Sequence, residues 1–362
     1  MKIVVTGTRG FPDIQGGIET HCEELYPRVA LYEGMDVTVV RRSRYVTDRS
    51  SLSYRKVKFK DINAPKIVGV ESAIHSLLSV FYARRVKADV LHIHGVGPSI
   101  VIPVARLMGL KVVVTHHGPD YERKKWGAFA RIIIKAGECF AAHFADEIIA
   151  ISPIIVHILK SRYNRTSHVH LIHNGVNLPG LVTYTDYLES LNLAPLQYVL
   201  AVGRFVKEKN FDRLIDVFAA SGSALRLVIA GDSDIETAYS RELKAKAKAK
   251  NVVLTGMVKG RKLAELYSHA ALFVLPSSHE GLPITLLEAM SYKRKALVSD
   301  IPANLAMKLE ADSYFRLNDW NDFRDKMLLQ LKKKNPEQSY DLSPYNWDTI
   351  ASETIRVYDL IT

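Results

Sequence analysis

The chain has 362 residues, 48% of them hydrophobic, and a formal net charge of +11. This length predicts two domains, and this composition supports sizeable cores and excludes a wholly disordered chain. Cys22 and Cys139 stand too far apart to suggest a disulfide framework or a zinc site, so a reducing, cytoplasmic location is expected. No signal peptide precedes the first strand, and residues 90–105, the longest apolar run, contain glycine, proline and histidine, so no membrane span is expected.

Nearly all of the net charge lies in the first half of the chain. Residues 1–180 contain 25 Lys and Arg against 15 Asp and Glu, which leaves +10 there and +1 in the rest. Such an excess is typical of a solvated basic surface, or of one that meets nucleic acid, an anionic membrane or a phosphorylated substrate. The basic residues do not belong to a recognisable nucleic-acid-binding fold, so a nucleic-acid partner is not expected.

The first half alternates short β-rich runs with helical patterns, which predicts a parallel sheet with helices on both faces. The predicted strands are residues 3–6, 36–40, 89–93, 111–115 and 147–151, and the predicted helices are 17–33, 71–86, 98–109, 126–145 and 152–162.

The pattern weakens over residues 177–195 and then resumes. The second set of predicted strands is 198–202, 225–230, 251–255, 272–276 and 296–299. We therefore expect two Rossmann-like α/β domains, residues 1–178 and 179–345, facing a central cleft. We expect a last helix, from Trp347 within residues 346–362, to pack back on the first domain.

The loop after the first strand, TGTRGFPDIQGG, places Gly16 and Gly17 before a helix. Glycines there suit either a diphosphate or an ordinary turn. TGTRGF also resembles the loop of extended short-chain dehydrogenases, and Arg41 and Arg42 would suit the phosphate of NADP, with Tyr121 and Lys125 at Tyr-x-x-x-Lys spacing. Pro12 and Asp13 oppose this reading, because they stand where a third glycine should open the helix.

Histidines follow two of the predicted strands, at the edge where ligands bind in open α/β sheets. They are His92 and His94 after one strand, and His116 and His117 after the other. No acidic or cysteine residues at ligand spacing complete a site along the chain, so no metal is expected.

In the second half, Arg204 and Lys209 follow a strand and precede a helix, so both can reach an anion beyond the sheet. The stretch HEGLPITLLEAM places Glu280 in a loop and Glu288 inside a helix predicted from Pro283 to Met290. Between these carboxylates, amides that lack intrahelical partners form a seat for an anion, at Leu282, Ile284 and Thr285. We therefore predict a nucleotide-sugar site, in which one carboxylate binds sugar hydroxyls, the amides bind a diphosphate and the other carboxylate binds ribose.

These motifs resemble the GT-B glycosyltransferases of family 4, over nearly the whole chain. EGLPITLLEAM is similar to the family's Glu-x7-Glu signature, and AVGRFVKEKN, HNGV and GGIETH resemble its other motifs. THHGPDYERKKWG and RGFPDIQGG resemble a subgroup that builds bacterial surface polysaccharides, some members of which are rhamnosyltransferases. Pro283 departs from the pattern, because many members have a second glycine there, and it leaves one fewer amide to donate.

The resemblance implies transfer from a nucleotide-sugar donor with retention of configuration and without a divalent metal or another cofactor. Arg204 and Lys209 would stabilise the leaving diphosphate, while Glu280 would hold the sugar and Glu288 the ribose. His117, with His116 as its rival, would be the functional histidine. Other donor-binding positions are implied at Gly16, Gly17, Met257, Val258, Gly281, Leu282, Ile284 and Thr285.

The acceptor in the resembling subgroup is a glycan on a lipid diphosphate carrier, so we expect a protein peripheral to the inner face of the membrane. Residues 122–140 supply cations for anionic lipid and apolar groups for the interface: Arg123, Lys124, Lys125, Arg131 and Lys135, with Trp126, Phe129 and Ile133. The alternatives are an NADP-dependent reductase, a catalytically silent sugar-nucleotide-binding protein, or a sugar-nucleotide 2-epimerase of the same two-domain architecture.

Overall fold

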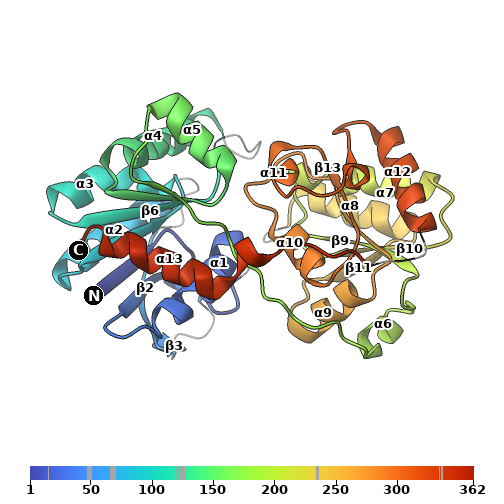
Figure 1. Ribbon diagram of the computed structural model, residues 1–362, viewed down its shortest axis with the longest axis horizontal. Coiled ribbons are helices and arrows are strands. Elements are labelled where there is room, and N and C mark those ends of the chain that lie inside the picture. Colours follow the sequence, from blue (N-terminus) through green and yellow to red (C-terminus); the bar gives the residue numbers. More distant parts are fainter. Residues whose placement is uncertain are drawn as a thin grey trace. The chain divides into compact units, whose positions relative to one another are not determined.

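A computed structural model of the chain describes residues 1–14, 16–46, 51–65, 71–119, 121, 127–233, 236–333, 335 and 337–362. The chain forms two compact units (Figure 1). Unit 1 comprises Met1–Gly175 and Pro344–Thr362, and unit 2 comprises Val176–Ser343. The division falls three residues before the predicted boundary, and each unit is described by itself.

Unit 1 is built on an eight-stranded sheet in the order β3-β4-β2-β1-β5-β6-β7-β8, in which all pairs are parallel except β3 with β4. The predicted parallel sheet is confirmed, and the strands β3, β4 and β8 were not predicted. The strands are β1 (Lys2–Thr6), β2 (Asp36–Arg42), β3 (Ser53–Tyr54), β4 (Val57–Ile62), β5 (Val90–His94), β6 (Lys111–His116), β7 (Glu147–Ala150) and β8 (Val169–Leu171).

The helices of unit 1 lie close to their predicted positions, except over residues 98–109. There a 3-10 helix η2 (Pro98–Val101) precedes the short helix α3 (Ile102–Leu107). Pro103 has no amide hydrogen to donate to residue 99, so an unbroken α-helical ladder cannot run from Pro98. The other helices are α1 (Gly17–Val29), α2 (Glu71–Arg85), α4 (Ala128–Phe144) and α5 (Pro153–Tyr163).

The C-terminal helix α13 (Trp347–Asp359) returns to unit 1 and packs against α1 (Figure 1). The Asn346 side chain starts it by accepting hydrogen bonds from the amides of Asp348 and Thr349. Trp347 is 5% exposed and lies so close to Gly175 that a Cβ there would stand 2.3 Å from the indole ring. This helix is therefore part of the unit 1 core rather than an appendage.

Unit 2 has a six-stranded parallel sheet in the order β11-β10-β9-β12-β13-β14. Because all its strands are parallel, their carboxyl ends share one edge, where the loops that carry the candidate site begin. The strands are β9 (Tyr198–Val202), β10 (Arg226–Ala230), β11 (Val253–Gly256), β12 (Leu272–Leu275), β13 (Ala296–Ser299) and β14 (Tyr314–Phe315).

Helices alternate with the strands of unit 2, as the pattern predicted. They are α6 (Asp186–Ser190), α7 (Phe211–Ala220), α8 (Ala238–Ala249), α9 (Gly260–Ser268), α10 (Ile284–Ser291), α11 (Pro302–Leu305) and α12 (Trp320–Lys332). Phe211, Leu214, Ile215 and Phe218 bury one face of α7 in a core shared with β9 and β10. Over the part of the chain that the structure describes, no helix is both long and apolar enough to cross a membrane.

The position of α13 leads to a stability prediction. Trp347→Ala should lower the free energy of unfolding by about 3–5 kcal/mol, as large-to-small changes of buried aromatic residues do. Arg356→Ala, on the exposed face of the same helix, should change it by about 0.5 kcal/mol or less. Urea unfolding followed by circular dichroism measures both changes. Equal effects of the two substitutions would mean that α13 does not belong to the core.

Candidate active site

Hydrogen bonds join two turns of unit 2 that follow the neighbouring strands β9 and β12. The first turn is Lys207–Lys209, and it ends at Asn210, whose left-handed backbone (φ 51°) opens α7. The Asn210 Nδ2 donates to the carbonyl of Pro276 over 2.8 Å. The Ser278 amide donates to the carbonyl of Glu208, also over 2.8 Å. These bonds fix the loop that carries Glu280 against the turn that carries Lys209.

As a result, Lys209 and Glu280 form an ion pair. The Lys209 Nζ lies 2.5 Å from the Glu280 Oε1, and the two side chains are 15% and 13% exposed. Partial burial weakens solvent screening, so the pair is held more firmly than an open surface pair. The structure thus brings together two predicted site residues that are 71 positions apart in the sequence.

Arg204 follows the end of β9 and is partly buried. The strand end before it packs closely on β10, because a Cβ on Gly231 would lie 2.0 Å from the Gly203 carbonyl oxygen. Gly231 also has φ 139°, so only glycine fits without strain. This close approach places Arg204 at the carboxyl edge of the sheet, as predicted.

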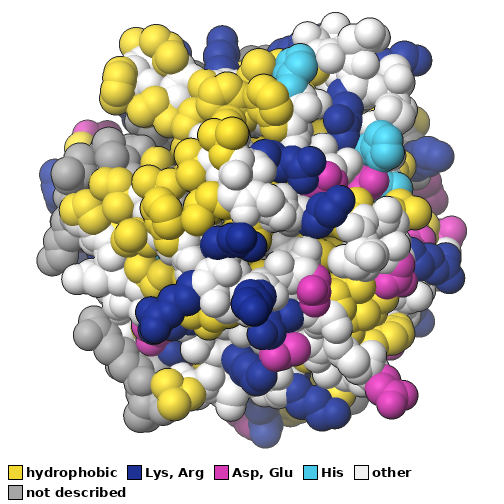
Figure 2. Space-filling model, turned by 90° about the vertical axis from the view of Figure 1, so that its left-hand side faces the viewer, with side chains coloured by type: hydrophobic (Ala, Val, Ile, Leu, Met, Phe, Trp, Pro, Cys, Tyr) yellow, Lys and Arg dark blue, Asp and Glu magenta, His cyan; other side chains and the backbone are white. Residues whose placement is uncertain are grey.

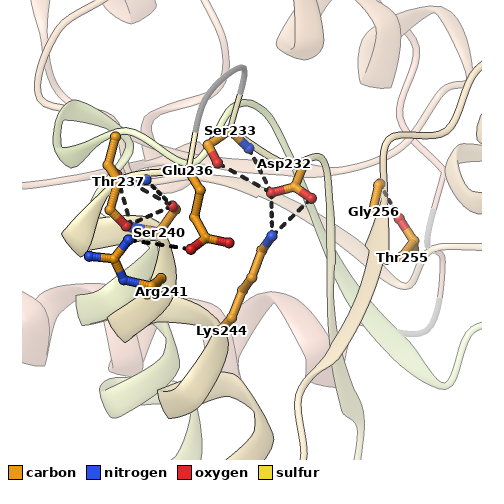
Figure 3. Close-up of polar contacts among 9 residues, drawn as sticks. All are labelled: Asp232, Ser233, Glu236, Thr237, Ser240, Arg241, Lys244, Thr255 and Gly256. Atoms are coloured by element: carbon orange, nitrogen blue, oxygen red, sulfur yellow. Dashed lines mark hydrogen bonds and ion pairs between the residues drawn. The ribbon is translucent and has the colours of Figure 1, made fainter.

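A polar cluster at the end of β10 was not predicted (Figure 3). The Asp232 carboxylate accepts from the amide of Ser233 at 2.7 Å and pairs with Lys244 at 2.8 Å. Burial opposes ionisation, yet the hydrogen bonds from Lys244 and Ser233 hold the pKa of Asp232 below its usual value. The cluster anchors α8, which begins with a capping box of Thr237 and Ser240.

The end of β11 lies beside this cluster, because the Gly231 amide donates to the Gly256 carbonyl over 2.9 Å. The predicted donor-binding residues Met257 and Val258 follow at once, and Met257 is exposed. The loop therefore begins at the shared carboxyl edge of the sheet, next to the end of β10.

Helix α10 begins at Ile284, one residue later than predicted, with Pro283 as its N-cap. The amides of Leu286 and Leu287 both donate to the Pro283 carbonyl, which leaves those of Ile284 and Thr285 at the open first turn. Leu282 and Gly281 precede the helix, so their amides belong to the loop. The Thr285 Oγ1 is buried and has no hydrogen-bond partner among the described residues.

Glu288 lies inside α10, where a tyrosine holds it. The Tyr267 hydroxyl donates to the Glu288 Oε2 over 2.8 Å, and the Tyr267 ring stacks on Tyr292 at 5.4 Å between centroids. Burial raises the pKa of Glu288 to about 7, against the opposing effect of the Tyr267 hydrogen bond. Tyr267 was missed, because nothing in the sequence around it marks a partner 21 positions away.

In unit 1, Gly17 begins α1 and Gly16 is its N-cap, with φ 154°. A Cβ on Gly16 would lie 1.9 Å from the Glu19 Oε2, the far end of a flexible side chain, but the φ of Gly16 is one that residues with side chains rarely adopt, so the backbone favours glycine. The Glu19 carboxylate accepts from the backbone amide of Arg9 at 3.0 Å and from its Nε at 3.2 Å. Glu19 therefore fixes the loop and holds a cation at the amino end of the helix.

The structure distinguishes the two rival histidines. His116 is buried, its Nε2 lies 2.9 Å from the Glu138 carboxylate, and its Nδ1 accepts from the Gly118 amide at 3.1 Å. Both of its ring nitrogens are thus used inside the fold. His117 is partly exposed, and its Nε2 lies 3.0 Å from the Nδ1 of His94. His117 is therefore better placed to meet a ligand.

The reductase alternative does not fit the residues on which it relied. Arg41 is 2% exposed, pairs with Asp61 at 2.7 Å and packs over the Phe59 ring, so it is not available to a phosphate. The Tyr121 hydroxyl donates to Glu138 over 3.0 Å, and Lys125 lies outside the described residues.

The predicted site residues thus fall into two sets. Gly16, Gly17 and His117 belong to unit 1, and the remainder, from Arg204 to Glu288, gather at the carboxyl edge of the unit 2 sheet.

Several proteins of known or named activity resemble the chain over much of its length. A galactosyltransferase of Escherichia coli, named for UDP-Gal and α-D-GlcNAc-diphosphoundecaprenol, is 28% identical, covering 72% of this chain and 73% of its own. An α-mannosyltransferase of Xanthomonas campestris, named for GDP-mannose and cellobiosyl-diphosphopolyprenol, is 25% identical, covering 86% of this chain and 82% of its own. An uncharacterised glycosyltransferase of Methanocaldococcus jannaschii is 25% identical over 99% and 98%.

Solved structures show the same fold. Sucrose-phosphate synthase from Thermosynechococcus elongatus superposes with a TM-score of 0.82 at 19% identity, covering 99% of this chain and 98% of its own. Anabaena HepE in complex with UDP-glucose gives 0.75 at 16% identity, covering 100% and 98%.

Two family models together account for most of the sequence. The model for Glycosyltransferase Family 4 matches residues 15–179, and that for Glycosyl transferases group 1 matches residues 189–343. The chain therefore belongs to the group 1 glycosyltransferases of family 4, and it has the GT-B fold of two Rossmann-like domains.

Proposed function

We propose that this glycosyltransferase moves a sugar from a nucleotide-sugar to a lipid-linked glycan, with retention of configuration, in bacterial surface polysaccharide synthesis. The observation that carries the proposal is the edge of the unit 2 sheet, where the Lys209–Glu280 pair, the first turn of α10 and Glu288 follow one another. The names of the relatives from Escherichia coli and Xanthomonas campestris support the choice of donor and acceptor classes.

The donor fits this edge from one end to the other. The Ile284 and Thr285 amides, at the positive end of α10, bind the diphosphate. Glu288 accepts hydrogen bonds from the ribose hydroxyls, and the backbone at Met257 and Val258 faces the base. Glu280 holds hydroxyls of the sugar, which replace part of its contact with Lys209.

Fixed cations take the role that a divalent metal has in other transferases. When the bond between the sugar C1 and the phosphate oxygen breaks, negative charge grows on the diphosphate, and Arg204 and Lys209 stabilise it. The acceptor oxygen bonds to C1 on the face that the diphosphate leaves, and its proton passes to the departing phosphate oxygen. His117 in unit 1 is the candidate for the functional histidine.

A surface of unit 1 suits a lipid-linked acceptor at the inner membrane face, reached from the cytoplasm. Figure 2 shows hydrophobic side chains gathered on this face beside lysines and arginines. Phe129 and Ile132 of α4 are 72% and 65% exposed. Ile133, predicted to enter the interface, is partly buried instead, because it lies toward the packed side of the helix.

Other exposed apolar side chains lie on α2 and α3, and they are Leu78, Phe81 and Leu107. Helix α3 packs against both α2 and α4. A surface pocket of about 440 Å³ adds cations for an anionic headgroup or diphosphate, from Arg131, Lys135 and Arg162. The predicted contacts Arg123, Lys124, Lys125 and Trp126 lie outside the described residues.

Donor binding should depend on the ionisation of Glu288. UDP-, GDP-, ADP-, CMP- and dTDP-sugars are compared by thermal shift, with NADPH as the rival ligand, and one nucleotide-sugar should stabilise the protein. Its affinity should rise from pH 6 to pH 8, because the carboxylate accepts ribose hydrogen bonds and the pKa of Glu288 is about 7. Glu288→Gln should weaken binding and flatten this dependence. A shift with NADPH alone would refute the proposed function.

The same raised pKa affects stability without donor. The unfolded chain ionises this group near its ordinary pKa of 4.5, whereas the folded chain retains the proton to about 7, so stability falls as the pH rises between these values. Glu288→Gln should therefore unfold less readily than the wild type at pH 8, by up to about 3 kcal/mol, and the difference should narrow at pH 5.

Lys209→Ala should reduce turnover of the identified donor about a hundredfold or more, because the cation acts on charge that grows in the transition state. The affinity of the protein for the donor should decrease far less. Lys207→Ala, an exposed lysine of the same turn, is the matched control and should leave both nearly unchanged. Release of nucleoside diphosphate in the presence of lipid-linked acceptor measures turnover. Activity should persist in EDTA, and an absolute need for a divalent ion would contradict the role given to the cations.

Vesicle co-sedimentation tests the membrane contact. Binding should need anionic lipid, decrease with added salt, and weaken when Arg131 and Lys135 are both changed to glutamate. The control is the same change at Lys248 and Lys250, two exposed lysines of unit 2. Equal binding to neutral and anionic vesicles would show that charge does not bring the protein to the membrane.

A further inference from the structure

Three histidines from three elements of unit 1 converge on one point. His21 lies in α1, His94 ends β5, and His117 follows β6. One ring nitrogen of each lies within 4.8 Å of the other two. No metal was expected from the sequence, because no acidic or cysteine residues at ligand spacing complete a site along the chain, but these three histidines are separated by 73 and 23 residues.

His21 is the member whose state calls for a ligand. It is 3% exposed, and neither of its ring nitrogens has a hydrogen-bond partner among the described residues. The Asn174 side chain lies close enough to raise the pKa of His21 by a hydrogen bond, although its buried Oδ1 has no partner of full hydrogen-bond geometry among the described residues. Buried polar atoms without partners are costly, and unexplained ones often mark a water or an ion.

The distances suit a transition-metal ion. Imidazole nitrogens bind zinc at about 2.0–2.1 Å, so two of them on one ion lie about 3 to 4 Å apart. The Nδ1 of His94 and the Nε2 of His117 are 3.0 Å apart, which meets this requirement. The nitrogen of His21 lies within 4.8 Å of both, so a displacement of its ring by about 1 Å completes the set.

We propose that His21, His94 and His117 bind a divalent transition-metal ion of the zinc class, with the fourth position left to water or to the Asn174 Oδ1. Three imidazoles favour zinc, nickel or copper over magnesium and calcium, which prefer oxygen ligands. Partial exposure of His117 gives the ion a way in.

A second shell supports His94 as a ligand. The His94 Nε2 lies 2.5 Å from the Tyr26 hydroxyl, which lies 2.9 Å from the His92 Nδ1. With Nδ1 bound to the ion, the Nε2–H of His94 donates to Tyr26, as ligating histidines commonly donate to an outer partner.

Zinc binding to the full chain, freed of metal with EDTA and then gel-filtered, tests the site by calorimetry at pH 7.5. One zinc ion should bind per chain at micromolar concentration or below. His21→Gln and His94→Gln should each weaken binding at least tenfold, and Tyr26→Phe about tenfold or more. The control is His168→Gln with His170→Gln, a pair that bonds Glu147 elsewhere in unit 1 and whose loss should not matter.

Circular dichroism and thermal unfolding establish that each variant folds. Thermal unfolding also gives a second measure of zinc binding, because zinc should raise the melting temperature of the wild type and of the control but not of the His21 and His94 variants. Cobalt in place of zinc should give the visible absorption of a nitrogen-ligated ion. Absence of stoichiometric binding, or equal binding by the folded His21 and His94 variants, would overturn the site. Failure of the donor panel with zinc binding intact would overturn the proposed function only.

Discussion

The candidate site of unit 2 depends on the hydrogen bonds that join the turns after β9 and β12. These strands are neighbours in the sheet, with Leu272 opposite Val199, so their following turns start side by side. The Asn210 side chain and the Ser278 amide then lock one turn to the other. Without these bonds, nothing in the backbone would hold the two turns together, and bringing two flexible charged side chains into one geometry yields little net stability at a solvated surface. The 2.5 Å pair of Lys209 and Glu280 is therefore a product of backbone architecture.

The two glutamates of the family signature lie in opposite environments, and this difference suits two roles. Glu280 has a cation against it, while Glu288 is buried beside a phenol. Burial raises the pKa of Glu288 to about 7, and the Tyr267 hydrogen bond opposes this rise. Two carboxylates eight positions apart thereby differ in chemistry, because the first lies against a cation and the second is a buried hydrogen-bonding group whose pKa is near neutrality. A helix that merely covered a sheet would not need Tyr267 to reach from α9 to its interior.

Sequence patterns predicted the two parallel sheets because buried parallel strands are continuous apolar runs, and YVLAV and LFVLP are such runs. The patterns did not predict β3 and β8, because these strands are too short to show a periodicity. They also missed the break before Pro103, because a single residue decides the backbone there. The Glu-x7-Glu spacing was visible because it lies within one loop and helix. Asn210, Tyr267, Glu138 and the histidine trio were not, because their partners come from distant elements and no local rule links residues such as His21 and His94.

In unit 1, burial keeps the histidines uncharged, so they differ in chemistry from the charged lysines and arginines. Burial lowers the pKa of His92 to about 3 and holds the pKa values of His94 and His117 well below their usual range, so these imidazoles are uncharged at pH 7. The positive excess of the first half is therefore carried by lysines and arginines, which lie mostly at the surface and attract anions at long range. Neutral rings can position hydroxyl groups, or bind a metal, without adding charge to the site. In unit 2, burial raises the pKa of Glu288 to about 7, so a carboxylate of the candidate site changes charge near neutral pH.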